Sequence, residues 1–166
     1  MTRAQKLLLS AGLALTVLGM IYGFWYAVFD EHPTLERMGV ALASAFAEVA
    51  KGDMTQAREH LDVYGATRFE YIRDVHTHGH LAALSTVLLL LGLFFNRLVF
   101  TARTGLWLAW LLVFGAAALP LGSFLEMFLA GPLPTILAML GAAALIIGLA
   151  AAAAGLLLTA DKSPAD

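Results

Sequence analysis

The sequence predicts an all-α integral membrane protein: a bundle of four transmembrane helices, with two amphipathic extracytoplasmic helices between spans one and two. The 166 residues are 60% hydrophobic and 13% charged, whereas a soluble domain is about 45–50% apolar and about 25% charged. The apolar residues form long uncharged runs, and runs beyond about 18–20 residues are typical of membrane spans. The polar stretch between the first two runs keeps a helical period. The length suits one membrane domain, 1–166.

The first span is predicted at 7–29, where Leu7–Phe29 contains no charged residue. It ends in Phe24-Trp25-Tyr26, an aromatic cluster suited to the membrane–water interface. The run is longer than the roughly 7–15 residues of a signal-peptide core. We therefore expect it to remain in the protein as a span.

A helical insert is predicted at about 33–74. Thr34 is expected to cap a helix that Gly52 ends, and Asp53 with Gln56 predicts a capping box that starts a second helix. Gly65 is expected to end this second helix, before a new helix enters span two. The apolar positions at helical spacing predict a face that lies on the bundle; they are Leu35, Met38, Leu42, Phe46 and Val49.

The second span is predicted at 75–96, and its length draws histidines to the membrane boundary. The stretch free of charge and histidine, Leu81–Phe95, has 15 residues. At about 1.5 Å per residue it covers roughly 22 Å of a hydrocarbon layer of about 30 Å. The preceding turn must therefore contribute to the crossing, which places His76, His78 and His80 at the boundary.

Spans three and four are predicted at 105–122 and 134–159, separated by a break around Gly131 and two prolines. Glycines recur every seven residues in span four, at Gly141, Gly148 and Gly155. Small residues let helices approach closely in lipid. Two uses of this repeat remain open: packing within the bundle, and a dimer seam along span four.

Charge distribution predicts the orientation and excludes several partners. Four spans place both termini on one side, where Lys and Arg are denser than in the long acidic loop. The positive-inside tendency then predicts cytoplasmic termini in a bacterial inner membrane. A net charge of −2 without a basic run argues against nucleic acid as a partner. The absence of cysteine excludes disulfides, iron–sulfur clusters and covalent c-type haem.

The histidine cluster is the main candidate site. On a helix, His76 and His80 share one face, whereas His78 follows Asp74 on the other. An i,i+4 histidine pair suits a transition metal or an axial position on haem, and Asp74 is expected to orient His78. Alternatively, the histidines are interfacial polar groups that reach toward water.

Topology adds further candidates at the same end of the bundle, where His and carboxylates of facing helices can hold cofactors. Glu126 is the only charge from Thr104 to Ala160, and an isolated ionisable residue in apolar sequence suggests function. The expected cofactor is a b-type haem or a Cu, Zn or Fe ion. The predicted metal ligands are His76, His80, Glu126, His78 and Asp74, and the predicted haem contacts are His76, His80, His32 and Met127.

The segment Val75-His76-Thr77-His78-Gly79-His80-Leu81 resembles small four-span bacterial membrane proteins with His-Thr-His at the start of the second span. More distantly, Arg73–Gly92 is similar to the second helix of haem-copper oxidase catalytic subunits, where a histidine near the outer surface ligates the low-spin haem. The resemblance implies haem ligation by His76. The chain lacks the other histidine-bearing helices of that family, so oxidase activity is not implied.

These observations lead to three functional hypotheses. The first is a membrane protein that binds a transition metal or b-type haem at its outer face, in electron transfer or metal handling. The second is a non-catalytic accessory or assembly subunit of a larger membrane complex, and the third an outward-facing pH or metal sensor. Besides the lipid bilayer, the expected partners are a second copy or the subunits of that complex.

Overall fold

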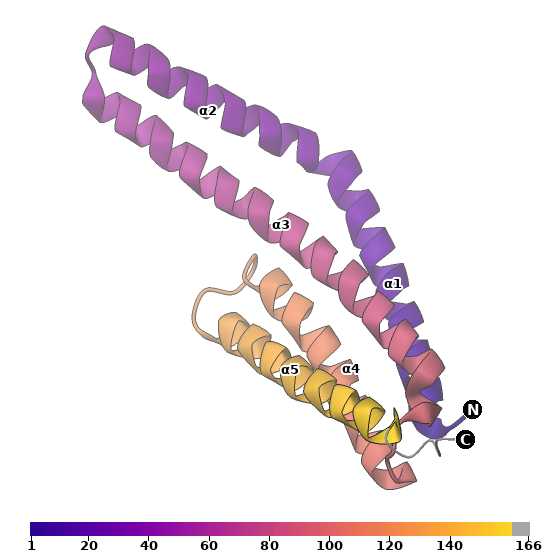
Figure 1. Cartoon of the computed structure of the whole chain (residues 1–166). Helices are drawn as coiled ribbons and strands as arrows, with labels where there is room; N and C mark the ends of the chain where they lie inside the picture. The colour runs from indigo at the N-terminus through magenta and orange to yellow at the C-terminus, as the bar shows by residue number, and fades with distance from the viewer. Residues whose placement is uncertain (161–166) are drawn as a thin grey trace. The chain divides into compact units, whose positions relative to one another are not determined.

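The computed structural model describes residues 1–160, which are almost entirely helical (Figure 1). The elements are α1 (Arg3–Phe29), α2 (Glu31–Lys51), α3 (Met54–Phe94), a short 3₁₀ helix η1 (Phe95–Arg97), α4 (Ala102–Leu125) and α5 (Leu133–Ala160). Within this part of the chain, α1, α3, α4 and α5 are long and apolar enough to cross a membrane. The structure therefore confirms the all-helical class and the four candidate spans.

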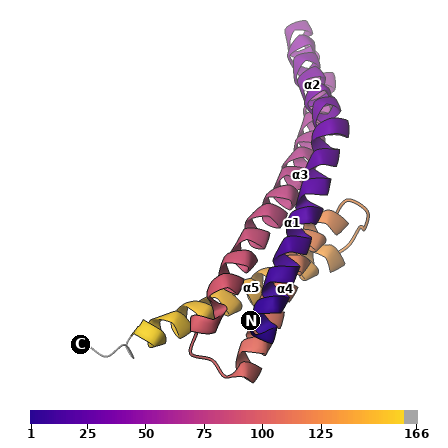
Figure 2. The ribbon, with the colours of Figure 1, turned by 90° about the vertical axis from the view of Figure 1, so that its right-hand side faces the viewer.

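The chain forms two compact units, and the first is a four-helix bundle. It contains Met1–Met20 and the chain from Thr77 onward. Leu8 of α1, Leu88 of α3, Leu112 of α4 and Leu145 of α5 all belong to its buried core. Within this unit α4 and α5 lie side by side, as Figures 1 and 2 show.

The glycine repeats are packed inside this bundle. A Cβ atom on Gly141 would lie 2.5 Å from the Leu119 backbone nitrogen, and one on Gly148 would lie 2.7 Å from Cδ2 of Leu112. Gly155 faces the ring of Phe100 in the same way. The structure thus confirms packing within the bundle as the use of the α5 repeat, because its glycine face is already covered.

The second unit, Ile21–His76, is an antiparallel hairpin of α2 and the first half of α3, with the last turns of α1 (Figure 1). Gly52 ends α2 in a left-handed conformation with φ 81°, and the Gly52 N–H donates to the Val49 carbonyl. Oδ1 of Asp53 then accepts from the backbone nitrogens of Thr55 and Gln56. The predicted turn between Gly52 and Asp53 is confirmed.

Two predicted boundaries of the insert are wrong. Thr34 does not cap α2, which begins three residues earlier at Glu31, because Pro33 is tolerated in a first helical turn. Gly65 does not end a helix, since α3 continues from Met54 to Phe94. A mid-helix glycine costs only about 1 kcal/mol, and Thr67, two residues further on, is a buried residue of the same helix.

The length of α3 has a consequence for its two halves. Its 41 residues correspond to about 60 Å at about 1.5 Å per residue, twice the thickness of a hydrocarbon layer of about 30 Å. Only about half of α3 can therefore be embedded. Because the apolar, uncharged half is the C-terminal one, the hairpin half is the part expected outside the hydrocarbon.

Candidate functional site

The interior of the hairpin is built from small and polar residues. The buried residues of α2 are Thr34, Ala41 and Ala45. Ala57, Thr67 and Asp74 are their buried counterparts on α3. Short side chains allow two antiparallel helices to approach closely, so this interior is already filled. Three of the large apolar side chains that the sequence predicts on the bundle-facing side of α2 point out of this interior: Leu35, Phe46 and Val49 are 44%, 66% and 48% exposed.

Large apolar side chains recur on one side of the hairpin, and several of them directly follow a buried residue. Leu35 follows Thr34, and on α3 Val75 follows Asp74. A step of one residue rotates the side chain by about 100°, and in antiparallel helices the same step turns both toward one side of the pair. We call this side the apolar face. Its large apolar members are Leu35, Leu42, Phe46, Val49, Met54, Leu61, Ile72 and Val75, and Arg58 and Arg68 lie among them.

The opposite side of the hairpin carries an ion pair and, beside it, the exposed apolar side chains of Val40 and Val63. It carries residues three positions after inward-facing ones, such as Arg37 of α2 and Glu70 of α3. Nη2 of Arg37 lies 3.8 Å from Oε2 of Glu70 and donates to Oγ1 of Thr34 at 3.0 Å. A shallow groove of about 470 Å³ on this side is lined by Arg37 and Ser44 of α2 and Val63 of α3. These contacts show that equivalent steps on the two helices reach the same side.

A buried polar cluster closes the base of the hairpin. Asp74 is 2% exposed. The Tyr22 hydroxyl donates to Oδ1 of Asp74 at 3.2 Å, and Nε of Arg73 lies 3.7 Å from the same oxygen. The rings of Tyr26 and Tyr71 lie beside this group, with centroids 6.5 Å apart. Sequence reasoning missed this cluster, although a tyrosine at the end of an apolar run and an Arg-Asp pair were its visible signals.

His78 and Asp74 each have a partner other than the predicted one. Nδ1 of His78 lies 3.1 Å from the carbonyl oxygen of Gly19, between α3 and α1 inside the bundle unit. Asp74 faces Tyr22 in the hairpin unit. Each contact joins the side chain to α1, through Gly19 for His78 and through Tyr22 for Asp74.

The remaining predicted ligands are divided between the two units, His32 and His76 in the hairpin unit and the others in the bundle unit. His32 is exposed in the first turn of α2, and His76 is exposed on α3. His80, Glu126 and Met127 are half-buried in the bundle unit, where Oγ1 of Thr135 donates to Oε1 of Glu126 at 3.0 Å. Within residues 1–160, no group of three or more His, Asp or Glu side chains is placed to hold a metal ion.

The fold and its surfaces thus define an all-helical protein with four helices able to cross a membrane and a two-faced helical hairpin. The chain matches no family model, and comparison with curated proteins and with solved structures finds no match. Its function is therefore argued from its own surfaces.

Proposed function

We propose that this protein is a non-catalytic accessory or assembly subunit of a larger membrane complex, and that its hairpin binds a partner through the apolar face. We place it in a bacterial inner membrane with both termini in the cytoplasm, as the density of Lys and Arg predicts. The observation that carries the proposal is the row of exposed large apolar side chains on one side of the hairpin.

The apolar face needs a cover that the hairpin itself does not provide. Burying a large apolar side chain contributes about 1.5–3 kcal/mol relative to leaving it in water. The interior of the hairpin is occupied by alanines and threonines, so these large side chains have no place there. Large exposed apolar patches with a polar rim mark interaction sites. Arg58 and Arg68 lie within the apolar face and are positively charged. We therefore expect the partner surface to be apolar, with carboxylates opposite these two positions.

The proposal predicts contact with a partner at one side of α2 only. A photo-reactive benzoylphenylalanine in place of Phe46 should cross-link a defined partner in native membranes, whereas the same residue in place of Val40 should not. Both side chains are large, apolar and exposed on α2, at 66% and 61%, but Val40 lies on the opposite side of the hairpin, in the groove beside Arg37. We expect at least a fivefold difference in cross-linked product at a single mass. Equal cross-linking at both positions, or none at Phe46, would contradict the proposal.

A second candidate is a transition-metal or b-type haem site that uses His76 and His80. It is favoured by their spacing, which places both on one face of α3, and by their access: His76 is exposed and His80 half-buried. Two imidazoles supply only part of a coordination shell. Further ligands would come from His32, Met127, Glu126 or another subunit, and the same pair could serve a pH or metal sensor.

Ligand loss should follow the face of the helix. His76→Ala and His80→Ala are each expected to remove most of a bound metal or haem, whereas His78→Ala should retain it, because Nδ1 of His78 faces the Gly19 carbonyl. Elemental analysis and the absorption spectrum of the purified protein measure this. A parent protein that carries no metal and no Soret band would eliminate this candidate and leave the accessory role.

A further inference from the structure

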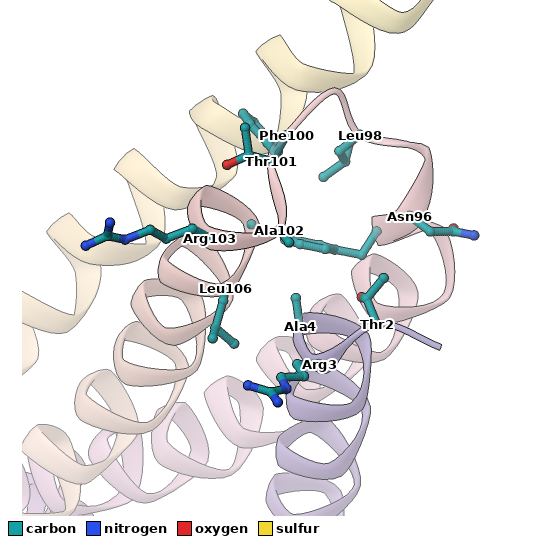
Figure 3. Close-up of a pocket in the computed structure, with 12 residues that line it drawn as sticks. Thr2, Arg3, Ala4, Asn96, Leu98, Phe100, Thr101, Ala102, Arg103 and Leu106 are labelled. Atoms are coloured by element: carbon teal, nitrogen blue, oxygen red, sulfur yellow. The ribbon is translucent and has the colours of Figure 1, made fainter.

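A second surface feature, a cavity of about 720 Å³, lies within the bundle unit at the ends where α1 and α4 begin (Figure 3). The α3–α4 connection forms its remaining side. Because α1 and α4 are the first and third candidate spans, their starts lie at the same membrane surface. Apolar and polar groups both line the cavity: Ala4, Phe95, Leu98, Phe100 and Leu106 are apolar, and Thr2, Arg3, Asn96, Thr101 and Arg103 are polar.

Both charged side chains that line this cavity are positive. Arg3 and Arg103 come from different helices, and no acidic residue lines the cavity. In positions 1–20 and 77–160, Glu126 is the only acid, and it lies at the opposite end of α4. Neither arginine forms an ion pair with a carboxylate in the part of the chain that the structure describes. Two guanidinium groups on the rim of one cavity favour an anion.

The backbone adds to this preference. Oγ1 of Thr2 accepts from the Gln5 nitrogen at the start of α1, and Oγ1 of Thr101 accepts from the Thr104 nitrogen at the start of α4. The first N–H groups of a helix carry a partial positive charge. The two helix starts at this cavity therefore add to the positive potential of the two arginines. The arginines alone already favour a negatively charged ligand.

We propose that this cavity binds an anionic phospholipid, with its phosphate held by Arg3 and Arg103 and its acyl chains against the apolar wall. Arginine matches the geometry of phosphate oxygens with paired N–H donors. The volume falls within the range of about 300–1,000 Å³ that is typical of small-molecule sites. The apolar residues beside the cationic ones fit a ligand that joins a phosphate to hydrocarbon at the membrane surface. A small soluble phosphate ester would leave this wall uncovered.

Native mass spectrometry of the detergent-purified protein, titrated with dioleoyl phosphatidylglycerol or dioleoyl phosphatidylcholine, tests the site. The parent protein should bind phosphatidylglycerol at least fivefold more tightly. The Arg3→Gln/Arg103→Gln variant should lose about tenfold in that affinity, whereas Lys6→Gln should stay within about twofold. Lys6 is the matched control because it lies on the same turns of α1, carries the same charge and does not line the cavity.

Leu106→Trp provides a second route, because it fills the cavity without changing charge and should also weaken phosphatidylglycerol binding. Wild-type affinity in both the double arginine variant and Leu106→Trp would overturn the proposal. An equal loss in Lys6→Gln would overturn it as well, since that result reports only surface charge. Displacement of the lipid by glycerol 3-phosphate at equal concentration would assign the cavity to a soluble phosphate ester instead.

Discussion

Gly141→Ala should destabilise the protein by about 2 kcal/mol, because the added methyl group overpacks the contact between α5 and α4. Its Cβ would lie 2.5 Å from the backbone nitrogen of Leu119 and 3.0 Å from the carbonyl carbon of Ala118. Backbone atoms cannot rotate away as a side chain can, so the two helices must separate. Thermal unfolding in detergent, followed by tryptophan fluorescence, should show a melting temperature lower by roughly 4–8 °C.

The control for this substitution has the opposite expected sign. Gly39 also lies inside a helix, but no atom lies within 4 Å of a Cβ built on it. Gly39→Ala should therefore raise stability by about 0.5–1 kcal/mol, the ordinary gain from replacing a helical glycine with alanine. If Gly141→Ala is stabilising to the same extent, the close approach of α4 and α5 is refuted.

The bundle was predictable because its signals are local in sequence. Long uncharged runs locate the spans, and the seven-residue spacing of Gly141, Gly148 and Gly155 already implied close helix packing. Each of these signals comes from one helix alone. The structure adds which partner each glycine meets, namely Leu119, Leu112 and Phe100.

The hairpin was harder to predict because helical phase does not say which face is buried. The spacing of Leu35, Phe46 and Val49 places them on one side of a helix, and we expected that side to lie on the bundle; the sequence does not say which residues face the other helix of the hairpin. The structure instead places Ala41 and Ala45 inside the hairpin. Small residues occupy the positions between the two helices because they allow the closest approach of the two backbones. The apolar side that remains outside is the one we propose for a partner.

The candidate site was least predictable, since it depends on contacts between distant residues. The separation of 52 positions between Tyr22 and Asp74 has no signature in sequence spacing. Asp74 was placed beside His78 because the two are four residues apart on one helix. Its burial against Tyr22 could only follow from knowing which helices pair.

Asp74→Ala should open the base of the hairpin. Asp74 is 2% exposed and accepts a hydrogen bond from the Tyr22 hydroxyl at 3.2 Å, with Nε of Arg73 3.7 Å from the same oxygen. Removing one partner of a buried charged pair typically costs about 3–5 kcal/mol. Hydrogen exchange in Ile21–His76, measured by mass spectrometry, should accelerate most in the turns around Tyr22 and Asp74.

Two further substitutions distinguish the effect of losing the buried carboxylate from the effect of losing any acidic side chain of the hairpin. Asp53→Ala removes an exposed carboxylate that caps α3 through the Thr55 and Gln56 nitrogens, so its cost should be only about 1 kcal/mol. Tyr22→Phe removes one hydroxyl and leaves Asp74 beside Arg73, with a comparable cost of about 1 kcal/mol. Hydrogen exchange in the hairpin should therefore be much faster in Asp74→Ala than in either control variant. Exchange in Asp74→Ala no faster than in Asp53→Ala would show that the buried cluster does not hold the hairpin together, and that the small residues between α2 and α3 suffice.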